Sequence, residues 1–269
     1  MDDLLKNLTI GFFAFVIVHG GLEQRARHAA TRQISEAFDH TGKIWTRVEP
    51  RGMFSLTVND MWAVDIYGVG TVSDRLPFYV YPRSGWKGSI RHLRLHLKDF
   101  TLAGLPIERF EADIPFATYD IGHAFWKERL HLRSAGVGPG EVEIGPKGLQ
   151  IFLLKKFDKI LSDVEVSFPN QKLLLSGHVT FLSGPTPFTA TGLLKARDGR
   201  FIDLIDPDFR FNGVPLNSIT TALLLKQINP VLDAETDLRI GNFFTMTDVT
   251  IGERSLTVHG RFTIPPEKK

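Results

Sequence analysis

The sequence predicts an α+β fold in which a long, strongly curled antiparallel sheet cradles about three helices, preceded by an N-terminal membrane-anchor helix. Three observations predict this fold. An apolar segment stands near the N-terminus, period-two alternation dominates residues 43–263, and helical periodicity interrupts that alternation in a few places. Strands that follow one another without regular helical crossovers favour α+β over α/β. A sheet of many long strands twists and coils, which gives it a concave face.

The N-terminal segment LTIGFFAFVIV, residues 8–18, is almost entirely apolar. A membrane span needs about 20 such residues, and the segment reaches that length between Leu4 and Leu22 if polar residues near its ends are tolerated. We interpret residues 1–22 as an uncleaved signal-anchor because no A-x-A cleavage site follows. A secretory segment and a buried core helix are the alternatives. Contact with the membrane is assigned to six residues: Ile10, Phe12, Phe13, Phe15, Val16 and Ile17.

Residues 23–41 predict a juxtamembrane amphipathic helix. Apolar side chains recur at near-helical spacing at Ala26, Ala30, Ile34 and Phe38, and Gly42 follows as a stop signal. The arginines of this helix follow the anchor, whereas two aspartates and one lysine precede it. The positive-inside rule therefore predicts a cytoplasmic body.

Residues 42–264 predict one α+β domain, because no linker or low-complexity tract interrupts them, and residues 265–269 form a tail. Strands alternate along 43–145, a helix is expected at 149–162, and a meander follows. A second helix is expected from Pro215 to Pro230, before a final hairpin.

Apolar side chains on alternate positions of these strands are expected to share the concave face. Along HLRLHLKDF, residues 92–100, the leucines point one way and the basic residues point the other. The expected apolar face comprises Leu93, Leu95, Leu97, Phe110, Ile114, Phe116, Leu173, Leu175, Val179 and Phe181. Periodicity alone allows two interpretations: a closed core, or a core that an acyl chain completes. Arg94 and Lys98, on the other face, are candidates for contact with a phosphate headgroup.

The composition and the motifs argue against several classes of function. The net charge of +2 disfavours nucleic-acid binding, and the absence of cysteine removes thiolate chemistry. His92 and His96 would lie about 13 Å apart on a strand, too far to share one metal ion. Asp203, Asp206 and Asp208 lack the glycine and terminal glutamate of a calcium loop. No phosphate-binding, zinc or nucleophile motif occurs, so we expect no enzyme activity, no cofactor and no metal.

The order of elements in the C-terminal half resembles the LmeA-like phospholipid-binding family of bacterial envelope proteins. The resemblance covers roughly residues 149–263 and rests on the step into DVEVSF, the ARDGR turn, the INP helix stop and the closing VHGRF. It implies a fold similar to tubular lipid-binding proteins, with phospholipid acyl chains in an apolar interior. It also implies a position on the outer side of the inner membrane, and it brings no catalytic motif.

The sequence therefore predicts a single-pass inner-membrane protein of the bacterial cell envelope that binds phospholipid. Its domain is expected in the periplasm, although the charges around the anchor favour the cytoplasm. The alternative is a non-catalytic accessory subunit of a respiratory or photosynthetic membrane complex, in which the same fold docks other membrane proteins. A short span with polar flanks suits lateral packing against such partners.

Overall fold

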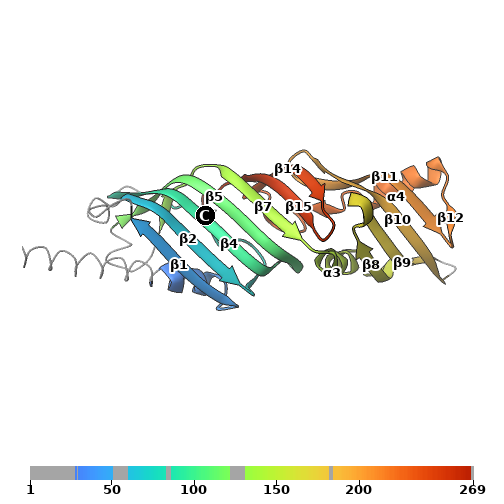
Figure 1. Ribbon diagram of the computed structural model, residues 1–269, viewed down its shortest axis with the longest axis horizontal. Coiled ribbons are helices and arrows are strands. Elements are labelled where there is room, and N and C mark those ends of the chain that lie inside the picture. Colours follow the sequence, from blue (N-terminus) through green and yellow to red (C-terminus); the bar gives the residue numbers. More distant parts are fainter. Residues whose placement is uncertain are drawn as a thin grey trace, which may run out of the picture.

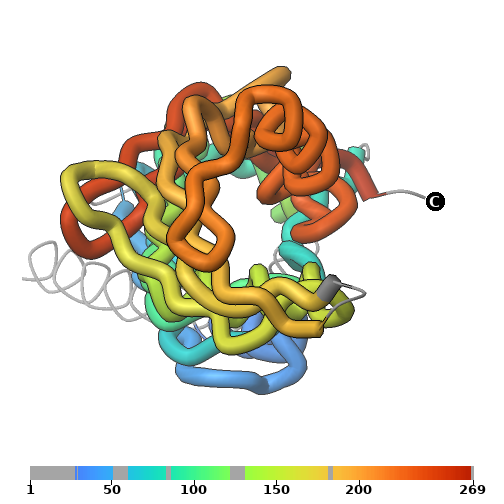
Figure 2. Tube along the Cα trace, turned by 90° about the vertical axis from the view of Figure 1, so that its right-hand side faces the viewer, coloured from blue at the N-terminus to red at the C-terminus, as the bar shows by residue number. Residues whose placement is uncertain are grey.

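The protein is an elongated, mostly β molecule of α+β class, seen here in a computed structural model (Figure 1). The structure describes residues 28, 30–50, 60–82, 86–121, 131–181 and 184–267. Two sheets follow one another along the long axis, and the view down that axis shows the backbone curling around it (Figure 2). The predicted strong curl is confirmed and takes the form of a half-barrel, but the predicted single sheet is divided into two.

The first sheet has nine strands, in the order β1-β2-β4-β5-β7-β15-β14, with β3 paired to β4 and β6 paired to β5. Its strands are β1 (Lys43–Pro50), β2 (Asp60–Val69), β3 (Val72–Ser73), β4 (Lys87–Leu102), β5 (Leu105–Asp120), β6 (Leu132–Ser134), β7 (Gly138–Ile144), β14 (Phe244–Ile251) and β15 (Leu256–Phe262). The expectation of purely antiparallel pairing is wrong at β2 and β3, which both pair with β4 in parallel. Parallel neighbours need a crossover rather than a hairpin, and residues 70–86 provide the connection from β2 to β4.

The second sheet has six strands, in the order β12-β11-β10-β9-β8, with β13 paired to β11. Its strands are β8 (Leu161–Ser167), β9 (Leu173–Phe181), β10 (Gly184–Arg197), β11 (Phe201–Phe211), β12 (Val214–Pro215) and β13 (Leu232–Asp233). The two sheets meet where the turn between β10 and β11 reaches β14, because the amide of Met246 donates to the carbonyl of Gly199 at 2.8 Å.

Helices occupy three places in the described chain, besides a short 3₁₀ turn, η1 (Pro169–Gln171). Residues 30–37 are helical, within the predicted juxtamembrane helix. Helix α3 (Pro146–Lys156) begins with a proline and ends with two lysines, both favourable positions. It ends six residues earlier than predicted, because residues 157–160 turn and β8 begins at Leu161. Helix α4 (Ser218–Ile228) lies between Pro215 and Pro230, as the sequence predicts.

The long β4–β5 hairpin exchanges its faces twice, which single-period alternation does not predict. At each exchange one residue adopts a left-handed backbone: Asp99 with φ 49° and Phe116 with φ 54°. Buried residues therefore stand three apart, as at Leu97 and Phe100. The prediction that Phe116 lies on the apolar face is wrong. Its side chain is 74% exposed, because the strand reverses its faces after Ile114.

The core of the first sheet is closed by aromatic and aliphatic side chains. Phe38, which follows the N-terminal helix, packs edge-on against Phe78 and Phe100 with ring centroids 6.1 Å apart in both pairs. Across β7, the ring centroid of Phe110 on β5 lies 5.5 Å from that of Phe262 on β15. These side chains belong to a cluster of buried residues to which both sheets contribute.

The predicted anchor, residues 1–22, and the first part of the predicted helix 23–41 lie outside the described residues. Within the part of the chain that is described, no helix has the length and apolar character to cross a membrane.

Candidate functional site

An apolar pocket of about 90 Å³ lies between α3, α4 and the second sheet. Among the described residues that line it, Gln227 alone is polar. The lining consists of Leu153, Phe157, Ile160, Leu161, Leu175, Val179, Phe188, Ala190, Leu204, Phe209, Phe211, Leu224, Gln227, Ile228 and Val231. A cavity with such walls holds apolar atoms rather than ordered water, because water finds too few hydrogen-bond partners there.

Helix α4 covers this pocket; a cap closes its first turn, and a side chain just after its last turn attaches it to β11. At its start, the side chain of Asn217 accepts a hydrogen bond from the amide of Thr220 at 2.9 Å, a regular N-cap. At its end, the side chain of Asn229 bonds both the amide and the carbonyl of Leu204 on β11, at 2.9 and 3.0 Å. No residue of α4 itself is fully buried, and Leu224, Leu225 and Ile228 pack against the core as half-buried side chains.

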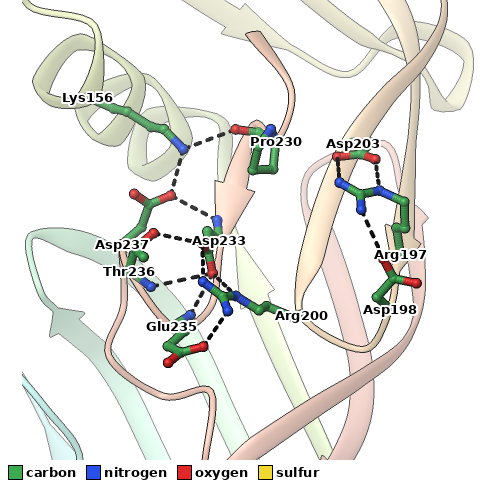
Figure 3. Close-up of polar contacts among 10 residues, drawn as sticks. All are labelled: Lys156, Arg197, Asp198, Arg200, Asp203, Pro230, Asp233, Glu235, Thr236 and Asp237. Carbon is green, nitrogen blue, oxygen red and sulfur yellow. Dashed lines mark hydrogen bonds and ion pairs between the residues drawn. The ribbon is translucent and has the colours of Figure 1, made fainter. Parts of the chain in front are cut away.

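The wall opposite α4 is fixed by a polar network that Figure 3 shows. Lys156, the last residue of α3, donates to the carbonyl oxygens of Pro230 and Val231 at 3.0 and 3.2 Å. Its ammonium also pairs with Asp237 at 2.6 Å. Val231 lines the pocket, so this lysine sets the distance between α3 and the chain that leaves α4.

A second part of the same network anchors the segment after α4 to the turn before β11. Asp233 receives two hydrogen bonds from Arg200, at 2.6 and 2.7 Å, and Arg200 also pairs with Glu235. The Arg200 guanidinium holds the pKa of the Asp233 carboxyl well below its usual range, against the opposing effect of burial. The carboxylate therefore stays charged under ordinary conditions, and this side of the pocket is rigid.

A smaller pocket of about 70 Å³ lies beneath the start of β4, against the N-terminal helix. Leu93 lines it together with Ile66 and with Ala30 and Ile34 of the helix. Tyr81 and Gln33 also line it, so its walls are more polar than those of the pocket under α4.

The structure divides the predicted apolar face into several groups. Leu175 and Val179 line the pocket under α4, and Leu93 lines the smaller pocket. Four other residues are enclosed in the core without lining either pocket: Leu95, Leu97, Phe110 and Ile114. Leu173 is also fully buried, and the side chain of Phe181 lies outside the described residues.

The predicted headgroup residues lie on the outer face of the first sheet, away from the leucines of β4. Arg94 pairs with the buried Asp65 at 3.4 Å, and Lys98 is exposed. A hollow of about 320 Å³ on this face is lined by Arg94, His96 and several carboxylates. Because this hollow and the pocket under α4 share no lining residue, Arg94 is not placed to contact a ligand held in that pocket.

Polar and charged side chains on the outer face pair with one another across neighbouring strands. His92 lies 3.1 Å from Asp113, and Arg109 reaches Glu141 and Glu143 at 2.8 and 2.9 Å. The hydroxyl of Ser255 and then Arg109 lower the pKa of Glu143. In the described chain, no group of three or more histidines and carboxylates is placed to hold a metal ion.

Sequence reasoning missed the residues that α4 contributes. Leu224, Gln227 and Ile228 line the pocket, yet the segment was recognised only as a helix. One signal was present: ALLL, residues 222–225, carries more leucine than one buried face of a short helix needs. The facing aromatics, Phe188 and Phe211, lie at the ends of strands that the alternation did identify.

In the comparisons with known proteins, no family model, curated protein or solved structure matches this chain.

Proposed function

We propose that the protein is a membrane-tethered phospholipid-binding protein of the bacterial cell envelope, and that it holds an acyl chain beneath α4. The single observation that carries this proposal is the apolar pocket between α3, α4 and the second sheet. The residues in which the family resemblance was seen, 149–263, include the whole lining of that pocket. No strong polar contact is needed, because each buried CH₂ group contributes about 0.8 kcal/mol.

The size of the pocket restricts how a chain binds. A pocket that buries a drug-sized ligand encloses about 300–1,000 Å³, so the 90 Å³ enclosed here accommodate only the end of a chain. A longer segment enters when α4 moves away from β11. The absence of buried residues in α4 supports such a movement, while the bonds of Asn217 and Asn229 keep the helix folded and attached.

Filling the pocket tests the proposal. Ala190 lines the pocket from β10, and Ala190→Leu places additional carbon atoms in the space that the chain would occupy. Ala196→Leu is the matched control, because Ala196 lies on the same strand and the same face but does not line the pocket. Native mass spectrometry of the gently extracted full chain should show a bound lipid in the unchanged protein and in the control, and none in Ala190→Leu.

Two results would contradict the proposal. A chain that never carries lipid, whatever the extraction, would remove its basis. Lipid retained equally by Ala190→Leu would place the ligand elsewhere. Stoichiometric co-purification with other membrane proteins, in the absence of lipid, would favour the accessory-subunit alternative.

A further inference from the structure

The end of the second sheet that lies farthest from the N-terminal helix has an unusual surface. We call residues 184–188 and 211–223 the distal tip; they form the right-hand end of the molecule in Figure 1. The two segments are neighbours, because Phe188 pairs with Phe211 and the amide of Asn212 donates to the carbonyl of Pro187 at 3.0 Å. Strand β12 and the start of α4 complete the tip.

The distal tip carries no charged side chain. Residues 179–194 and 211–225 contain no aspartate, glutamate, lysine or arginine, although 23% of the whole chain is charged. These two charge-free stretches are far apart in the sequence and come together only through the pairing of β10 and β11. The end of a soluble sheet that meets only water normally carries charge, because charged side chains prevent association of edges and ends.

Large apolar side chains project from the same surface. Val214, Ile219 and Leu223 are 65%, 75% and 60% exposed. Ile219 and Leu223 are four residues apart and share one face of α4, while Leu224 and Ile228 line the pocket from another face. Helix α4 is thus apolar both towards the pocket and towards the outside.

We propose that the distal tip inserts into the interfacial layer of a lipid bilayer. A stable protein interface needs about 800 Å² on each partner and a polar rim, whereas the two charge-free stretches offer no charged side chain for such a rim. A Cβ atom added at Gly184 or at Gly213 would meet open space, with no atom within 4 Å. A fluid bilayer accepts such an exposed, charge-free apolar surface without complementary shape.

The charges that border the tip indicate how it binds. Arg210 is ion-paired with Asp208 at 3.0 Å, which leaves Lys226, in the last turn of α4, as the cation nearest in sequence to the charge-free stretch 211–225. Insertion of apolar side chains therefore dominates, and the tip binds neutral as well as anionic bilayers. Where the proposed function holds, a chain leaving the bilayer at the tip reaches the pocket along α4 without crossing water.

A single fluorescent label tests the contact, because the chain contains no cysteine. Ser218→Cys places an environment-sensitive dye at the exposed start of α4, and Glu253→Cys places it in the exposed turn between β14 and β15. The full chain, kept soluble in amphipol, is mixed with phosphatidylcholine vesicles that carry a lipid-chain quencher. The dye at position 218 should become brighter and then be quenched by the labelled lipid, while the dye at position 253 should report water.

Paired charge substitutions identify the residues that insert. Ile219→Asp with Leu223→Asp, in the Ser218→Cys background, should weaken vesicle binding by about tenfold or more. Thr220→Asp with Ala222→Asp adds the same charge to other exposed positions of α4 and should have a much smaller effect. Unchanged thermal unfolding of both doubles, which alter only exposed side chains, establishes that the fold persists.

The outcomes separate this proposal from the proposed lipid pocket. If the dye at position 218 stays in water with both neutral and anionic vesicles, the insertion proposal is wrong. The distal tip would then be a binding surface for another protein. Equal responses at 218 and 253 overturn it as well, since they indicate non-specific adsorption. If the chain contacts vesicles but carries no lipid in native mass spectrometry, the insertion proposal stands and the proposed lipid pocket is wrong.

Discussion

Tyr119 lies directly across the β4–β5 hairpin from Gly88, and its ring occupies the space that a side chain at position 88 would need. A Cβ atom at Gly88 would overlap the ring carbons of Tyr119. The tyrosine is only 3% exposed, and burial, followed by the nearby carboxylate of Asp60, raises its pKa to about 12. The glycine therefore permits a large aromatic to close this end of the core.

Gly88→Ala should destabilise the protein by about 1–3 kcal/mol, because the added methyl group forces the Tyr119 ring out of its position. Urea unfolding followed by circular dichroism measures the loss. Gly252→Ala is the control, since a Cβ there meets only ordinary contacts, and it should change little. Equal effects of the two substitutions would show that the ring does not depend on the glycine.

Stability should fall in alkali because of Tyr119. The folded-state pKa is raised from 10.0 to about 12, so the unfolded chain loses this proton first as the pH rises. The stabilising contribution is complete below pH 10 and is lost between pH 10 and 12, by about 2–3 kcal/mol in total. Tyr119→Phe should remove this part of the alkaline loss. Unfolding free energies of the two chains that decline in parallel over this range would contradict the assignment.

Asp233→Asn should weaken the junction beside the pocket by roughly 2 kcal/mol at neutral pH, because two charge-assisted hydrogen bonds from Arg200 are lost. The pKa of Asp233 is lowered in the folded state, so its contribution is present above the unfolded value of 3.8 and fades as the pH falls below it. The difference between the two chains should therefore shrink in acid. Asp198→Asn, which breaks an exposed pair with Arg197, should have almost no effect at any pH.

Phe110 and Phe116 occupy equivalent positions in the sequence alternation but should respond differently to truncation. Phe110→Ala empties a core position that is 2% exposed and should cost about 3–5 kcal/mol. Phe116→Gly should be neutral or stabilising, by up to about 1 kcal/mol, since Phe116 is exposed and holds a left-handed backbone that glycine adopts freely. Thermal and urea unfolding of both variants decide the matter, and a large loss in Phe116→Gly would indicate a contact for its ring.

The strands and the two later helices were predictable because their signals are local. Alternation located β1, β4, β5, β9 and β10 closely, and prolines bounded α4. The prediction from alternation failed at Phe116, because a single residue with a left-handed backbone reverses which strand face is buried. No sequence pattern in residues 110–117 indicates this reversal. The parallel pairing of β2 with β4 could not be predicted from the sequence either, because strand partners depend on the path of the connecting chain.

The candidate site was only half predictable for a related reason. Leu175 and Val179 belonged to a face that alternation identifies, but the central leucines of β4 belong to the same kind of pattern and are packed solid. Whether an apolar face lines an open pocket or a filled core depends on how many large side chains pack against it. Phe38, Phe100, Phe110 and Phe262 fill the first sheet, whereas α4 leaves room over the second.

By itself the sequence determined the fold class, the positions of most strands, the helix between Pro215 and Pro230, and the two charge-free stretches. The tertiary structure alone decided that those stretches form one surface, that the strands form two sheets, and that the more apolar of the two pockets lies under α4. The physical reason is that hydrophobic periodicity records which face of an element avoids water. It does not record which element covers that face or how completely the covering side chains fill the space.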